Sequence, residues 1–117
     1  MNAVIEKTVI EKTLDELRKR GGLSGIDVAN VADVSKATVS RWTTGKAAPQ
    51  SKTQLVLSDL RYVVDCLNAF YSADETRAWL YSRNHLLGGQ RAVDLIHQGR
   101  TEEVLDAIES LAATTYL

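Results

Sequence analysis

The stretch from Ser35 to Lys52 concentrates cations and small hydroxyl groups, and it contains no acidic side chain. Long cations bind phosphate oxygens, and small hydroxyl groups can lie against a base edge without blocking the groove. The alternative interpretation is a solvated helix face, which is the usual role of a basic face. The pattern favours contact with DNA through a polar face that comprises Lys36, Thr38, Ser40, Arg41, Thr44 and Lys46.

Two short helices with a tight turn between them would position this polar face. Residues 26–31 and 37–42 carry apolar side chains at helical spacing, and residues 32–34 make the turn. The predicted inner faces are Ile26, Val28, Ala29 and Val31 in the first helix, and Ala37, Val39 and Trp42 in the second. Ser35 is typical of an N-cap, and Gly45 is well placed to end the second helix. These features predict a helix-turn-helix.

An amphipathic helix is predicted before this motif, over about residues 4–20. Its apolar stripe comprises Ile5, Val9, Ile10, Leu14 and Leu17. Three cations, Arg18, Lys19 and Arg20, stand in its last turn. Cations in this position suit the negative end of the helix dipole, and they could equally reach phosphate. Both interpretations stay open.

A long helix is predicted after the motif, from about Lys52 to Tyr71, with Ser51 as its N-cap. Its apolar stripe comprises Leu55, Val56, Leu60, Val63, Val64, Leu67 and Phe70. A face this wide can cover the DNA-binding helices and still leave surface for a second subunit. Because dimers read operators with two-fold symmetry, we expect a homodimer.

The remaining residues predict short helices joined by polar connections. Ser72 and Glu75 have the spacing of a capping box, and the helix that follows carries Trp79 and Leu80 inward. Residues 82–91 form a polar connection, a short helix then ends at Gly99, and a final helix begins at Thr101. Its apolar face comprises Val104, Leu105, Ile108, Leu111 and Ala112. No stretch alternates with a period of two, so the chain is predicted to be all-α.

Charge divides the chain of 117 residues into two regions. Residues 1–52 hold nine Lys/Arg against six Asp/Glu, whereas residues 53–117 hold five against nine, which gives net charges of +3 and −4. We expect a DNA-binding region over 1–52 and a region for other contacts over 53–117. No apolar run has the length of a signal-peptide core or a membrane span, which predicts a cytoplasmic protein that does not bind membranes.

The features that could carry catalysis or metal binding are weak. The segment Gly88–Arg91 precedes a helix, but it lacks the Lys-Ser/Thr of a P-loop and is too short for a dinucleotide fingerprint. His85 and His97 have no cysteine or glutamate at zinc-ligand spacing, and Cys66 fits a buried small hydrophobe. We predict no enzyme, no metal and no cofactor. A small enzyme or ligand-sensing domain that uses residues 84–91 is kept as an alternative hypothesis.

Two groups of residues resemble known families. Val28-Ala29, Val34-Ser35, Val39-Ser40-Arg41-Trp42, Gly45 and Pro49 resemble the Xre-type (Cro/repressor) helix-turn-helix. Arg77-Ala78-Trp79-Leu80, Asn84, Leu87-Gly88-Gly89, Asp94-Leu95-Ile96, Gly99 and Glu103-Val104-Leu105 resemble the C-terminal domain of the Xre/MbcA/ParS antitoxin family. One departure is Ala92, which stands where that family usually has proline.

The resemblance implies an all-α antitoxin of a type II toxin-antitoxin system, with a Cro/repressor-like helix-turn-helix bundle over 1–52 and a helical dimerisation and toxin-binding region over 53–117. Its partner would be a RES-domain toxin that degrades NAD, and its first half would repress the shared operon. The residues expected to bind the toxin are Glu102, Glu103, Asp106, Glu109, Tyr116 and Leu117, and the C-terminal region as a whole would block the toxin's active site. The alternative is a stand-alone helix-turn-helix repressor whose second half only dimerises.

Overall fold

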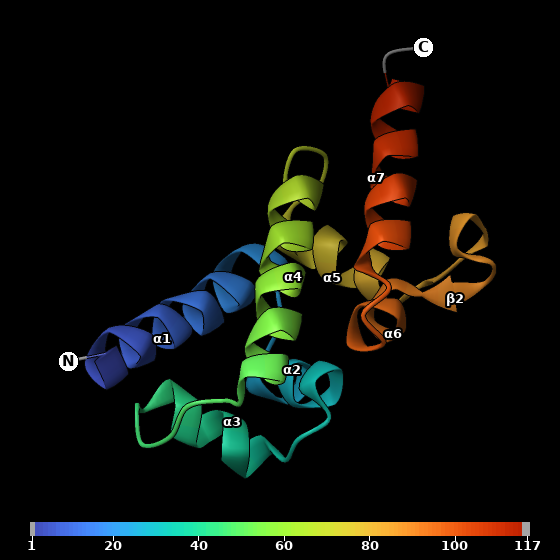
Figure 1. The fold of residues 1–117 in the computed structure, drawn as a ribbon. Coiled ribbons are helices and arrows are strands. Elements are labelled where there is room, and N and C mark those ends of the chain that lie inside the picture. The colour runs from blue at the N-terminus through green and yellow to red at the C-terminus, as the bar shows by residue number, and fades with distance from the viewer. Residues whose placement is uncertain (1, 116–117) are drawn as a thin grey trace.

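The computed structural model describes the backbone of residues 2–115 and the side chains of residues 9–114. Within this range the chain is mostly helical, which confirms the all-α prediction (Figure 1). The helices are α1 (Asn2–Gly21), α2 (Gly25–Ala32), α3 (Lys36–Thr43), α4 (Ser51–Leu67), α5 (Ala73–Tyr81), α6 (Ala92–His97) and α7 (Thr101–Thr115).

The connection between α5 and α6 holds a small hairpin that the sequence pattern did not predict. Strands β1 (Arg83–Asn84) and β2 (Gln90–Arg91) pair antiparallel around a single 3-10 turn, η1 (His85–Leu87). Gly88 and Gly89 both have positive φ, at 67° and 81°, which is why glycine suits this tight turn. At this turn the side chain of Leu87 is buried, whereas that of Leu86 stays exposed.

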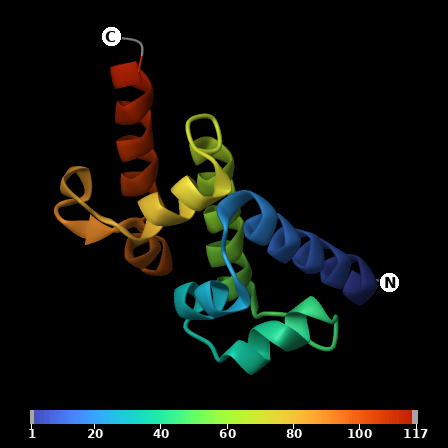
Figure 2. The ribbon, with the colours of Figure 1, turned by 180° about the vertical axis from the view of Figure 1, so that it is seen from behind.

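The helices are arranged around α4, which runs through the middle of the molecule (Figure 1). Both views place α3 at one end of the molecule and the end of α7 at the opposite end (Figures 1 and 2). The molecule measures 49 × 22 × 22 Å, so these two ends are well separated. α1 packs against α4 and α5, and its first turns extend to one side.

One hydrophobic core joins the helices of both halves. It contains Leu17 from α1, Val28 from α2, Trp42 from α3, Leu60 from α4 and Ile96 from α6. Each of these side chains is at least 97% buried. Burying such side chains is the main favourable contribution to folding, because it removes apolar surface from water. The core therefore holds the helix-turn-helix against the C-terminal helices.

Four residues that the sequence predicts to face the core are exposed in the structure. The side chains of Val9, Ile26 and Leu55 are more than half exposed, and Ala37 is also exposed. In three cases the buried residue lies two positions further along, namely Val28, Val39 and Leu57. Two residues turn an α-helix by about 200°, so two apolar residues at this spacing cannot both face inward.

The predicted helix starts are mostly confirmed. The side-chain oxygens of Ser35 and Ser72 accept hydrogen bonds from the backbone N–H groups of Thr38 and Glu75. Ser72 and Glu75 form the expected capping box. The predicted N-cap at Ser51 is wrong, because Ser51 is the first residue inside α4. Gln50 is the N-cap, and its side chain makes no capping hydrogen bond.

Candidate functional site

Helix α3 presents a polar face to solvent at one end of the molecule. The Ser35 cap begins the helix, and Val39 and Trp42 fix its inner side in the core. The opposite side exposes Lys36, Ser40, Arg41 and Thr44, which recur at spacings of three and four residues and so lie on one face. This arrangement gives the cations and hydroxyl groups the accessibility that contact with a DNA groove requires.

Thr38 lies at the edge of this face. It is partly buried, and its hydroxyl group is 2.9 Å from the hydroxyl group of Ser35 at the helix start. Its backbone N–H donates to the Ser35 hydroxyl oxygen at 3.1 Å. Thr38 therefore supports the N-terminus of α3 as well as contributing to its polar edge.

The loop after α3 extends the basic surface. Lys46 is exposed, and its backbone N–H donates to the carbonyl oxygen of Arg41 at 2.9 Å, which holds the loop against the helix end. Pro49 is buried and Lys52 is exposed on the first turn of α4. Among the described side chains, Lys36, Arg41, Lys46 and Lys52 are in no ion pair, so their charges are available to phosphates.

The cations at the end of α1 differ from those of α3 because they already have carboxylate partners. Arg18 and Lys19 lie 2.7 and 3.0 Å from the carboxylate of Asp15, and Arg20 lies 2.9 Å from that of Asp65. The two hydrogen bonds, first from Lys19 and then from Arg18, lower the pKa of Asp15. These ion pairs favour the structural interpretation of the cluster over phosphate binding.

Helix α7 presents an acidic surface in the other half of the molecule. Glu102, Glu103, Asp106 and Glu109 are all exposed, and residues 101–117 contain no Lys or Arg. Only Glu103 has a cationic partner among the described residues, the guanidinium group of Arg100 at 2.6 Å, which lowers its pKa through a side-chain hydrogen bond. The other two predicted toxin-binding residues, Tyr116 and Leu117, lie outside the described residues.

The apolar stripe of α7 leaves the core before the helix ends. Val104, Ala107 and Ile108 are buried, whereas Leu111 and Ala112 are only partly buried. The last turns extend beyond the neighbouring helices in both views (Figures 1 and 2). The end of α7 therefore offers partly exposed apolar side chains beside its acidic residues.

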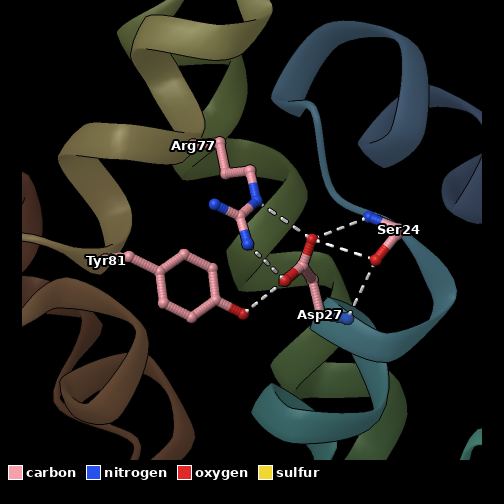
Figure 3. A network of polar contacts seen from close by, with 4 residues as sticks. All are labelled: Ser24, Asp27, Arg77 and Tyr81. Carbon is pink, nitrogen blue, oxygen red and sulfur yellow. Dashed lines mark hydrogen bonds and ion pairs between the residues drawn. The ribbon is translucent and has the colours of Figure 1, made fainter.

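The sequence interpretation missed a polar network that joins the helix-turn-helix to α5. The carboxylate of Asp27 in α2 accepts hydrogen bonds from the Ser24 backbone, the Arg77 guanidinium group and the Tyr81 hydroxyl group (Figure 3). We call these four residues the Asp27 network. The Ser24-x-x-Asp27 spacing of a capping box was a visible signal for part of it, but no local signal indicated Arg77 or Tyr81.

The environment of Asp27 favours its ionised form. The side chain is 7% exposed, and burial by itself would raise its pKa. The hydrogen bonds from Arg77, Ser24 and Tyr81 together outweigh this effect, so the pKa of Asp27 is lowered. Partial burial, and after it the hydrogen bond to the Asp27 carboxylate, raise the pKa of Tyr81.

Among the described residues no group of three or more His, Cys, Asp and Glu side chains could hold a metal ion. Within the same residues, no helix is both long and apolar enough to cross a membrane. The loop that includes Gly88 lines a groove of about 390 Å³ beside α7, together with Leu86, Glu103 and Asp106.

Comparisons with known proteins agree with this arrangement. A helix-turn-helix family model matches residues 14–55. The chain is 31% identical over 109 residues to the mycobacterial cidal antitoxin MbcA of Mycobacterium tuberculosis, a match that covers 93% of this chain and 96% of that protein. It is 32% identical over 117 residues to the probable mycobacterial cidal antitoxin Rv3188 of the same species, with both chains covered completely.

A solved structure shares the fold. One chain in the crystal structure of the M. tuberculosis MbcT-MbcA toxin-antitoxin complex superposes with a TM-score of 0.79 and 31% sequence identity. The superposition covers 93% of this chain and 98% of the other. The two halves of the sequence thus match as one unit, helix-turn-helix and C-terminal helices together. The chain belongs to the family of the mycobacterial cidal antitoxin MbcA.

Proposed function

We propose that this protein is the antitoxin of a type II toxin-antitoxin system and the repressor of its own operon. The observation that carries the proposal is the match, over nearly the whole of both chains, to a chain in a toxin-antitoxin complex. A helix-turn-helix alone would account for residues 14–55 only. The similarity over the remaining helices supports a second function, which is binding of a toxin.

The toxin that we propose is a RES-domain enzyme that degrades NAD, and the end of α7 is the surface that meets it. The partly buried Leu111 and Ala112 supply apolar area, and the exposed Glu102, Asp106 and Glu109 supply negative charge. Interfaces combine such an apolar centre with a polar rim. A tail beyond α7 would then lie over the entrance of the toxin's active site and block it, with Tyr116 as an aromatic anchor.

Autorepression would use the polar face of α3. Lys36, Ser40, Arg41 and Thr44 would enter the major groove with Thr38 at their edge, and Lys46 would hold a phosphate. We expect Arg41→Ala to weaken operator binding by roughly 1–3 kcal/mol if its guanidinium group reads a guanine edge. Lys46→Ala should weaken binding to all sequences about equally. An unchanged operator affinity of the Arg41 variant would contradict its proposed role.

Repression of a two-fold symmetric operator would require two copies of the chain. The surface that we propose for dimerisation includes the groove between α1 and α4, which Val9 and Leu55 line, and Tyr62 on the same face of α4 as Leu55. These three residues expose 53%, 67% and 58% of their area. A second copy would bury these apolar side chains. Leu55→Glu should convert a dimer into a monomer in sedimentation analysis without loss of helix content. A variant that stays dimeric would place the interface elsewhere.

Co-expression with the neighbouring open reading frame tests the antitoxin function directly. We expect a stable complex on co-purification, and growth that is spared only while this protein is present. Truncation after Ala112 should release the toxin while DNA binding is retained. Loss of dimerisation instead, or a homodimer that leaves the neighbouring product behind, would favour the stand-alone repressor.

A further inference from the structure

We infer that the Asp27 network positions the helix-turn-helix for DNA, and that Arg77 and Tyr81, which lie outside the helix-turn-helix, are positioning residues for operator binding. This inference rests on the proposed repressor function. It assigns a role in DNA binding to two residues of the C-terminal half that lie on α5 and not on the DNA-binding helices (Figure 3).

The network joins the start of α2 to α5 through a buried carboxylate. Arg77 Nε and Nη2 donate to the two carboxylate oxygens of Asp27 at 3.2 and 3.0 Å, and the Tyr81 hydroxyl group donates at 2.9 Å. Ser24 donates to the same carboxylate through its backbone N–H at 2.9 Å. Bidentate pairing by a guanidinium group restricts direction as well as distance. The first turn of α2 is therefore oriented by α5.

The donors from α5 also stabilise one another. The guanidinium carbon of Arg77 lies 4.7 Å from the centre of the Tyr81 ring, and that of Arg91 lies 5.7 Å from it. Arginine over the face of an aromatic ring is an attractive cation–π arrangement. The Tyr81 ring thus contacts two guanidinium groups. Its hydroxyl group is directed at Asp27 (Figure 3).

The other end of α2 is held by α6. His97 Nδ1 donates to the carbonyl oxygen of Val31 at 2.8 Å, in the last turn of α2. This carbonyl lies at the C-terminal end of the helix, where carbonyl groups lack partners within the helix. Polar contacts from the C-terminal half thus reach α2 at both ends, at Asp27 and at Val31.

Helix α3 takes its position from α2 and α1, against which it packs. The turn between α2 and α3 is tight, with Asp33 in the left-handed conformation at φ 57°, and the backbone N–H of Val34 donates to the Ala29 carbonyl oxygen at 3.0 Å. A rigid turn transmits a rotation of α2 directly to α3. Because base contacts depend on accurate placement of the recognition helix, loss of the α5 donors should weaken operator binding without removing any DNA-contacting residue.

Operator affinity of an Arg77→Ala variant tests the inference. The probes are a duplex that spans the region upstream of the protein's own coding sequence and a shuffled duplex of equal length. At a temperature where circular dichroism shows full helix content for every variant, we expect Arg77→Ala to lose at least about fivefold in affinity for the upstream duplex, the lower end of usual coupling between sites. Affinity for the shuffled duplex should stay within about twofold, because phosphate contacts are less sensitive to orientation.

Two further variants keep the test decisive. Arg100→Ala removes a matched bidentate pair, with Glu103 at 2.6 and 2.8 Å, that does not reach α2, and it should leave both affinities unchanged. Tyr81→Phe removes only the hydroxyl donor and should give a smaller loss of the same kind, even if Arg77→Ala fails to fold.

The outcomes separate the two proposals. Folded Arg77 and Tyr81 variants that bind the upstream duplex like the wild type would overturn this inference and leave the repressor function standing. Equal losses on both duplexes would also overturn it, because they would indicate a general weakening. A wild-type protein that does not prefer the upstream duplex would refute the repressor function and this inference together.

Discussion

Substitution of Asp27 by asparagine should destabilise the protein in a manner that depends on pH. The carboxylate is 7% exposed and accepts hydrogen bonds from Arg77, Tyr81 and Ser24. Asparagine keeps one acceptor oxygen but directs an NH2 group at Arg77, so the charge-assisted pair is lost. Such hydrogen bonds contribute about 1.5–3 kcal/mol. Because the Arg77 side chain is 47% exposed, solvent screening reduces its share, and we expect a cost of about 2 kcal/mol in total.

The sign of the pH dependence follows from the direction of the pKa shift. The pKa of Asp27 is lower in the folded protein than in the unfolded chain. Its contribution to stability is therefore complete above about pH 5 and decreases as the pH falls through the lowered folded pKa. The difference in the free energy of unfolding between wild type and Asp27→Asn should be largest near neutral pH and should shrink toward pH 3.

Urea denaturation of both proteins between pH 3 and pH 7 measures this difference. At pH 7 the loss corresponds to a fall in Tm of about 8 °C for a chain of this size. Asp94→Asn is the control, because Asp94 also has a bidentate arginine partner but is 45% exposed, so its cost should stay below about 0.5 kcal/mol. A difference for Asp27→Asn that is constant across this pH range would refute the reasoning.

Three further predictions test the packing. Leu57→Ala should cost about 2–5 kcal/mol in urea denaturation and Ile26→Ala far less, because these side chains are 1% and 53% exposed; equal costs would contradict the helix orientations. Trp42→Ala should cost about 3–5 kcal/mol and abolish operator binding at 37 °C, which a fluorescence-anisotropy assay measures. Gly22→Ala should destabilise more than Gly99→Ala in thermal denaturation: φ is positive at both, but only at Gly22 would the new methyl group meet a backbone carbonyl oxygen of α5, at 3.0 Å. A smaller loss at Gly22 would show that α5 can move aside.

Local patterns in the sequence predicted the elements well. Ser35 and Ser72 begin helices because a side-chain oxygen satisfies a free N–H group at the helix start, an effect that involves only neighbouring residues. Gly45 and Gly99 end helices because they adopt positive φ without steric cost. The same locality made the polar face of α3 predictable, since its cations and hydroxyl groups belong to one short segment.

Predictions of helix orientation were less reliable. Leu55 and Ile26 are apolar and lie near buried residues in the sequence, yet the packing of neighbouring helices selects which side of α4 and α2 is covered. Several registers of the apolar stripe fit the same sequence, and only contacts with other helices distinguish them. Of these two residues, only Leu55 belongs to the exposed surface that we propose for dimerisation.

By itself the sequence determined the mostly helical class, most of the helix starts, the basic and acidic halves and, through its motifs, the antitoxin family. Only the tertiary structure decided that Asp27 meets Arg77 and Tyr81, 50 and 54 residues away in the chain. It also decided that α3 and the end of α7 lie at opposite ends of the molecule (Figure 1). The physical reason is that both results depend on how the shared core orients the helices, and the summed burial of many distant side chains sets that orientation.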